Sequence, residues 1–155
     1  MRNSTVYHRT VTDYEYERCC PNDPLNPRIL SFPIAYEAAS AGLGNYLQDS
    51  GFEYVELLAA DIPLKAKFGV SVSGSSMEPD YHDGEIVLVE PAPAILNGEL
   101  GIFNLDGEAY FKKLVVDVEN KTIILRSLNS DYIDIIVKVG SNLHTYGRVV
   151  GKLRK

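Results

Sequence analysis

A serine-rich turn near the middle of the chain is the first place where the residue types could do chemistry. Residues 72–79, Val-Ser-Gly-Ser-Ser-Met-Glu-Pro, follow an apolar run typical of a β-strand. A serine held in a tight turn at a strand end can face a substrate, and Gly74 permits close backbone approach. A short turn of helix from Met77 would point free N–H groups at an oxyanion formed beside the serine. An ordinary turn between strands has the same pattern, so the turn alone does not establish a nucleophile.

A serine nucleophile needs a base, and Lys112 is the best-placed candidate. Residues 109–115 form a strand-like run in which alternation puts Lys112 and Lys113 on opposite faces. One lysine therefore points inward, where lost solvation lowers the pKa of its ammonium and lets the neutral amine accept a proton. Alternatively, both lysines only cover an edge strand. The three histidines, His8, His82 and His144, have no supporting spacing, and His82 and His144 are expected in surface turns.

Three motifs in this order resemble those of the LexA-like self-cleaving peptidases. They are Gly74-Ser75-Ser76-Met77-Glu78-Pro79 with Asp83-Gly84-Glu85, then Phe111-Lys112-Lys113-Leu114, and upstream the small-residue stretch Ser40-Ala41-Gly42-Leu43-Gly44. Thirty-five positions separate Ala41 from Ser76 and 36 separate Ser76 from Lys112, and both intervals are similar to those of the family. One departure is Ser75, at a place often held by an acidic residue or Asn.

The resemblance implies a role for each matching residue. Ser76 would be the nucleophile, Lys112 the general base, and Ala41-Gly42 the bond that is cut, with Ser75 and Lys113 as bystanders. The backbone N–H groups of Ser76 and Met77 would form the oxyanion hole. No metal or cofactor is implied. The resemblance also implies a twisted, mostly-β, partly open barrel-like fold with a hydrophobic cleft, a homodimer formed through the C-terminal portion, and a RecA filament as inducer.

The elements that must position these residues are short strands. Eight β-rich runs separated by Gly, Asn and Asp indicate a mostly-β domain without a βαβ rhythm. They are Glu53–Leu58, Phe68–Ser73, Glu85–Val89, Leu100–Leu105, Ala109–Val116, Thr122–Ser127, Ile133–Val139 and Thr145–Lys152. Asp106-Gly107 predicts a hairpin turn within Leu100–Val116, and Glu119-Asn120-Lys121 predicts the next turn.

The pattern divides the chain into three parts. Residues 1–31 are Pro-rich and lack sustained apolar spacing, which predicts a flexible arm or linker. Residues 32–50 are crowded with Ala, Ser and Gly, which predicts a flexible loop that carries the cleavage site. Residues 51–155 form the predicted Ser/Lys peptidase domain.

Composition limits the partners. The 155 residues carry a formal net charge of −6, so no overall basic field attracts nucleic acid. No paired amphipathic helices are visible in Met1 to Ser40, so DNA contact would need a helix-turn-helix domain outside this chain. Cys19 and Cys20 are adjacent and too few for a zinc site, which fits a reducing cytoplasm. No apolar run approaches a membrane span or a signal-peptide core, so we expect a soluble cytoplasmic protein without a membrane anchor.

Four roles are compatible with these features. The first is the peptidase domain of a transcriptional repressor that cleaves itself in the response to DNA damage. The second is a UmuD-like accessory subunit of an error-prone DNA polymerase, which loses a short arm. The third is a non-catalytic β-barrel interaction module in which Ser76 and Lys112 are relics. The fourth, a signal-peptidase-like enzyme, would need a membrane anchor that the pattern does not supply.

Overall fold

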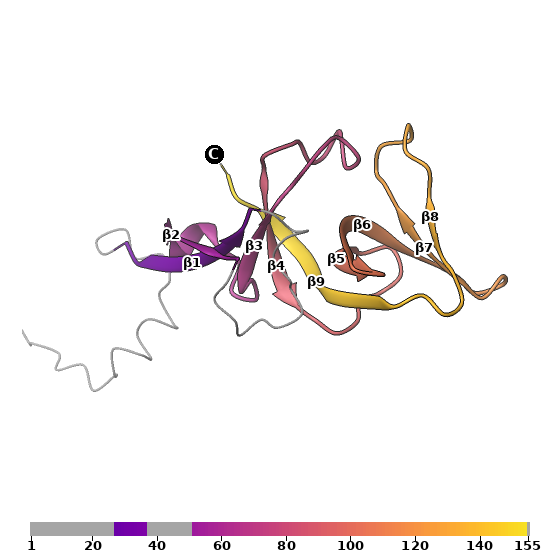
Figure 1. Cartoon of the computed structure of the whole chain (residues 1–155). Coiled ribbons are helices and arrows are strands. Elements are labelled where there is room, and N and C mark those ends of the chain that lie inside the picture. Colours follow the sequence, from indigo (N-terminus) through magenta and orange to yellow (C-terminus); the bar gives the residue numbers. More distant parts are fainter. Residues whose placement is uncertain (1–26, 37–50, 155) are drawn as a thin grey trace, which may run out of the picture.

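The computed structural model describes residues 27–36 and 51–154, and this part of the chain is mostly β with almost no helix (Figure 1). A single short 3-10 turn, Ala59–Asp61, joins β2 to β3 in this described part. The strands are β1 Ile29–Ala35, β2 Glu53–Leu58, β3 Phe68–Ser71, β4 Ile86–Pro91, β5 Leu100–Leu105, β6 Glu108–Asp117, β7 Thr122–Arg126, β8 Ile135–Val137 and β9 Leu143–Lys152. All eight predicted runs form strands, and the mostly-β prediction is confirmed.

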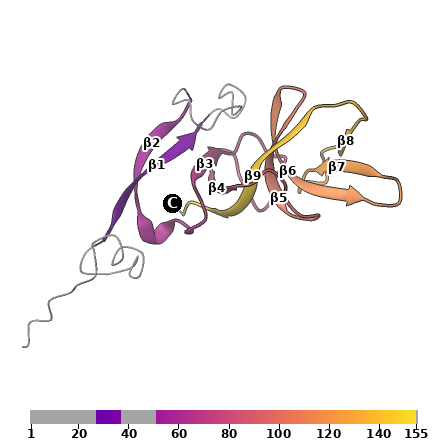
Figure 2. The same ribbon diagram turned by 90° about the horizontal axis from the view of Figure 1, so that it is seen from below.

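The strands form one open sheet in the order β2-β1-β3-β4-β9-β5-β6-β7-β8. Its end strands, β2 and β8, do not pair with each other, which agrees with the partly open fold expected from the sequence. The C-terminal strand β9 lies in the middle, antiparallel to both β4 and β5. Figure 2 shows the β1–β2 hairpin at one end and the β7–β8 hairpin at the other, with β9 crossing between the two halves. The last strand of the chain therefore joins both halves.

Strand β1 was not predicted. Its residues span the boundary at 31/32 between the predicted arm and the predicted cleavage loop, where prolines suggested irregular structure. Phe32 and Ile34 alternate toward the core and are 5% and 1% exposed, as a half-buried strand requires. Pro33 is tolerated because pairing with β3 begins only at Ile34, so one side of the strand is unpaired at Pro33. The last residues of the predicted arm therefore belong to the sheet.

Two predicted turns form as expected. Asp106 and Gly107 have φ of 52° and 95° and close the β5–β6 hairpin, because both central residues of the tightest hairpin turns need positive φ. Lys121 has φ of 52° in the turn between β6 and β7. The β5–β6 register pairs Gly101 with Lys112, which fixes where on the sheet the predicted base lies.

The core consists of three clusters distributed along the open sheet. One cluster centres on β3, β4 and β9, the second packs β1 against the turn before β3, and the third joins β5, β6 and β7. Phe103, Leu125 and Leu114 form the third cluster on the sheet face that also carries Lys112. The Lys112 side chain therefore projects from an apolar part of the sheet.

The close pairing of β9 with β4 leaves no room for a side chain at Gly147. A Cβ atom on Gly147 would meet the carbonyl oxygen of Glu90 and lie 2.6 Å from Cγ1 of Val89. Gly151, on the same strand, has Pro63 Cγ as its nearest neighbour at an ordinary 3.6 Å. Arg148, the next residue of β9, forms ion pairs with Glu90 at 2.6 Å and with Glu99 at 2.9 Å.

We predict that Gly147→Ala destabilises the fold by about 1–3 kcal/mol, because backbone must move to admit the methyl group. Gly151→Ala is the matched control and should be neutral or slightly stabilising. Urea unfolding at constant pH measures both. Equal stabilities for the two variants would show that β9 does not pack against β4 as closely as described.

Candidate active site

The structure brings Ser76 and Lys112 together from distant strands. Ser76 lies in the turn that follows β3, and Lys112 lies in β6, with β4, β9 and β5 between them in the sheet order. The Lys112 Nζ is 2.7 Å from the Ser76 Oγ, which is hydrogen-bonding distance. An ammonium at this position donates to the hydroxyl, whereas a neutral amine can accept the hydroxyl proton. The geometry therefore suits a nucleophile and its base.

Lys112 is buried, as strand alternation predicted for one of the two lysines. Its side chain is 8% exposed and shares the inward face of β6 with Leu114, whereas Lys113 is only half-buried. Burial lowers the pKa of the Lys112 ammonium from its ordinary value of 10.5, because the apolar surroundings disfavour the charged form. The neutral amine is thus populated at a lower pH than in a solvated lysine.

Residues 76–80 form consecutive turns rather than the short helix that the sequence suggested. The Glu78 N–H donates to the Ser75 carbonyl at 3.1 Å, and the Tyr81 N–H donates to the Met77 carbonyl at 3.1 Å. The Met77 side chain is 1% exposed and anchors the turn in the core. Within the described residues, the N–H groups of Ser76 and Met77 have no hydrogen-bond partner, so both can donate to an oxyanion.

Side chains on two sides hold the backbone of this turn. Gly74 has φ of +77°, a conformation that favours glycine, and its N–H donates to Asp83 Oδ1 at 2.7 Å. From the loop after β7, the Asn129 N–H donates to the Ser76 carbonyl and its Nδ2 to the Ser75 carbonyl, both at 3.0 Å. The sequence motif contained Asp83 without a role, and Asn129 was missed because an Asn in a polar turn carries no sign of its distant partner.

Neither described histidine bonds to the serine. His82 is exposed and its Nδ1 lies 3.4 Å from Glu78 Oε1. His144 is exposed but lies in β9 rather than in the expected turn, because the strand begins two residues earlier than predicted, and its ring packs against Tyr146. The structure thus leaves Lys112 as the candidate base among the titratable side chains described near Ser76, while His8 lies outside the described residues. The predicted bond Ala41-Gly42 also lies outside them.

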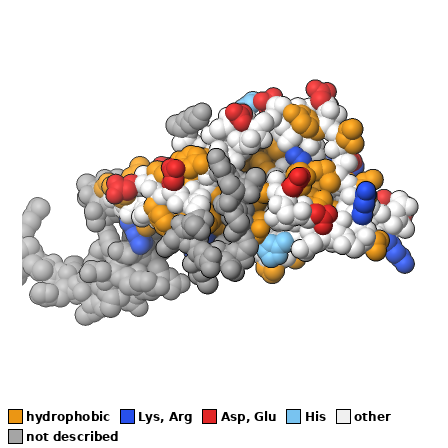
Figure 3. Space-filling model, viewed as in Figure 1, with side chains coloured by type: hydrophobic (Ala, Val, Ile, Leu, Met, Phe, Trp, Pro, Cys, Tyr) orange, Lys and Arg blue, Asp and Glu red, His pale blue; other side chains and the backbone are white. Residues whose placement is uncertain are grey.

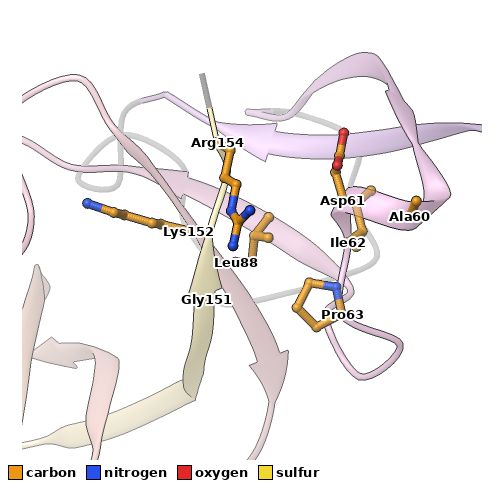
Figure 4. Close-up of a pocket in the computed structure, with 8 residues that line it drawn as sticks. All are labelled: Ala60, Asp61, Ile62, Pro63, Leu88, Gly151, Lys152 and Arg154. Atoms are coloured by element: carbon orange, nitrogen blue, oxygen red, sulfur yellow. The ribbon is translucent and has the colours of Figure 1, made fainter.

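A hollow elsewhere on the molecule is separate from this pair. Figure 4 shows it between the 3-10 turn and β9, where the Lys152 side chain extends away from Asp61. Lys152 instead donates to the Asp80 carbonyl at 2.9 Å and pairs with Glu85 at 3.1 Å, which ties β9 to the segment after Ser76.

In Figure 3, acidic and basic side chains are interspersed on the described part of the visible face. None of the described residues forms a helix long and apolar enough to cross a membrane.

Comparison with known proteins identifies the class. The Peptidase S24-like family model matches residues 33–150, which include Ser76, Lys112 and every described strand from β2 to β8. The chain therefore belongs to the Peptidase S24-like, LexA-like family of peptidases, and the resemblance found in the sequence is confirmed.

The curated relatives of this chain include LexA repressors. The LexA repressor of Carboxydothermus hydrogenoformans is 27% identical over 165 residues, which cover 98% of this chain and 79% of that protein. The LexA repressor of Magnetococcus marinus is 34% identical over 84 residues, 54% of this chain and 36% of its own length. The LexA repressor of Oleidesulfovibrio alaskensis is 34% identical over 88 residues, which cover 56% of this chain and 42% of that protein. In these two relatives, the similarity covers less than half of the repressor.

We predict that Lys112→Met raises the melting temperature near neutral pH relative to Ser76→Ala, because it removes a poorly solvated ammonium. The folded-state pKa of Lys112 is depressed, so below it the full cost of the buried charge is present. The cost decreases as the pH rises from the folded-state pKa toward 10.5. In this pH range Lys112 is neutral in the folded chain and still protonated in the unfolded chain, so the folded state gains stability as the pH rises.

Calorimetry from pH 7 to 10.5 checks this prediction. Each 1 kcal/mol in the free energy of unfolding corresponds to about 2–4 °C in the melting temperature at this chain length. The advantage of Lys112→Met should shrink with rising pH, and Lys113→Met should show no such trend. A pH-independent difference between Lys112→Met and Ser76→Ala would contradict it.

Proposed function

We propose that this chain is the self-cleaving peptidase domain of a LexA-like transcriptional repressor, with Ser76 as nucleophile, Lys112 as general base and Ala41-Gly42 as the target bond. The observation that carries the proposal is the 2.7 Å approach of the Lys112 Nζ to the Ser76 Oγ at a buried site. Membership of a peptidase family and the small residues at positions 41 and 42 support it.

The proposed reaction follows from the groups present. The neutral Lys112 amine takes the Ser76 hydroxyl proton while the Oγ attacks the carbonyl carbon of Ala41. The N–H groups of Ser76 and Met77 stabilise the oxyanion, and the Lys112 ammonium then protonates the departing Gly42 nitrogen. Lys112 next removes a proton from water, which hydrolyses the ester to Ser76 and restores the hydroxyl. Every proton moves through one nitrogen, so no further cofactor is required.

The sheet register supports attack within one chain. The parallel ladder between β1 and β3 pairs Ala35 with Val70. Ala41 follows Ala35 by six residues, and Ser76 follows Val70 by six residues in the same direction. Six extended residues span about 20 Å. The β1–β3 pairing therefore places the end of β1, which precedes the target bond in the chain, beside β3, which precedes Ser76.

The remaining parts of the proposal come from the family resemblance and the relatives' names. Cleavage would separate this domain from a DNA-binding part of the protein, and a RecA filament would trigger it by favouring the docked cleavage segment. The domain would also form the homodimer and act in the cytoplasm. The similarity to LexA repressors favours this role over a UmuD-like polymerase subunit. A non-catalytic interaction module would leave the buried lysine unused.

We predict that the purified chain cleaves itself faster as the pH rises, because deprotonation of Lys112 populates the base. The rate should rise about tenfold per pH unit and level off below pH 10.5, since burial lowers the pKa of Lys112. Mass spectrometry should find fragments that end at Ala41 and begin at Gly42.

Matched variants test the assignment. Ser76→Ala and Lys112→Met should abolish cleavage, whereas their neighbours Ser73→Ala and Lys113→Met should cleave within about twofold of the native rate. Intact mass at every pH, or equal cleavage by Ser76→Ala, would disprove the self-cleaving function.

We further predict that the rate constant does not depend on protein concentration, because attack within one chain is a unimolecular step. It should stay constant over a hundredfold dilution. A tagged Ser76→Ala chain mixed with active protein should remain intact over several half-lives. Rates proportional to concentration would instead indicate cleavage between chains.

A further inference from the structure

The loop that follows β7 packs against the turn that carries Ser76. Asn129 is half-buried in this loop and makes two hydrogen bonds to successive residues of the turn. Its backbone N–H donates to the Ser76 carbonyl at 3.0 Å, and its side-chain Nδ2 donates to the Ser75 carbonyl at 3.0 Å. One residue therefore contacts two consecutive peptide groups.

These two peptide groups include the N–H groups of the proposed oxyanion hole. The Ser75 carbonyl shares a planar peptide unit with the Ser76 N–H, and the Ser76 carbonyl shares the next unit with the Met77 N–H. In a trans peptide, the C=O and N–H point in opposite directions. Hydrogen bonds that hold both carbonyls toward Asn129 therefore aim both N–H groups away from it. Those are the two N–H groups without a partner among the described residues.

Asn129 is itself fixed in the orientation that this requires. Its Oδ1 accepts a hydrogen bond from the Asp131 N–H at 3.0 Å, so its Nδ2 is the atom directed at Ser75. The Tyr132 N–H donates to the Asn129 carbonyl at 3.2 Å and closes the same loop. An aspartate would keep the contact with Asp131 but place an acceptor against the Ser75 carbonyl.

We propose that Asn129 is a positioning residue that orients both peptide groups of the oxyanion hole, an inference that rests on the proposed function. Its side chain acts on the Ser76 N–H and its backbone on the Met77 N–H. The Ser75 carbonyl also accepts from Glu78 N–H at 3.1 Å, so losing the Asn129 amide loosens this peptide without releasing it. The effect should therefore be smaller than the roughly hundredfold loss that follows removal of an oxyanion donor.

The test compares Asn129→Asp with Tyr132→Phe, a control from the same loop. Tyr132 contacts the Ser75 hydroxyl at 2.8 Å and no peptide group of the turn. We expect Asn129→Asp to slow self-cleavage about tenfold when rates are compared at the plateau pH, where Lys112 is neutral and a shift of its pKa by the new carboxylate no longer affects the rate. Tyr132→Phe should stay within about twofold of the native rate. Both variants should remain folded at the assay temperature, and Asn129→Asp should melt several degrees lower because its new acceptor faces the Ser75 carbonyl.

A small fluorophosphonate separates positioning from docking, because its reaction with Ser76 uses the oxyanion hole without the cleavage segment. Asn129→Asp should slow this reaction by a similar factor, and the amide resonances of Ser76 and Met77 should shift in a Lys112→Met background. Native fluorophosphonate reactivity and unshifted amides in Asn129→Asp would overturn the inference alone. A native chain inert both to cleavage and to the reagent would overturn the proposed function and the inference with it.

Discussion

A lysine side chain held inside an apolar sheet face beside a serine hydroxyl is the interaction on which the rest of this structure depends. Burial lowers the pKa of the Lys112 ammonium, and among the described residues Ser76 Oγ is the acceptor that its Nζ contacts. Removing the lysine from water costs stability, yet the same desolvation makes its amine available as a base. The fold therefore tolerates an unfavourable residue at the point where the proposed chemistry needs it.

The open sheet makes this contact possible because it brings together strands that are not neighbours. Ser76 follows β3 and Lys112 lies in β6, so β4, β9 and β5 must curve between them. Irregular register at Leu88/Val89 and at Ile102/Phe103 marks the two ladders of β9. Such bulges increase local twist. The ion pairs of Arg148 with Glu90 and Glu99 link β9 to β4 and to the residue that precedes β5.

The sequence predicted the parts of the fold whose causes are local. Alternation and turn residues located eight strands, and the Asp106-Gly107 turn fixed the register that turns Lys112 inward. Strand β1 was missed because Pro33 argued against a strand, although Phe32 and Ile34 alternate correctly; only its one-sided pairing explains the proline. The helix expected at Met77 is a set of turns, because Asp83 and Asn129 fix the backbone from outside the segment.

The candidate site also combines features with local causes and features that depend on distant residues. A nucleophile and a base are side chains, so a motif can indicate them, whereas an oxyanion hole consists of backbone groups whose direction depends on distant partners. Asn129 lies 53 positions beyond Ser76 and meets it through the curvature of the sheet. The Ser76 and Lys112 side chains already contact each other in the structure. If they form the catalytic pair, the chemistry is preassembled, and the fraction of chains with the target bond docked sets the rate. Control of cleavage would then act on the segment after β1 rather than on the dyad.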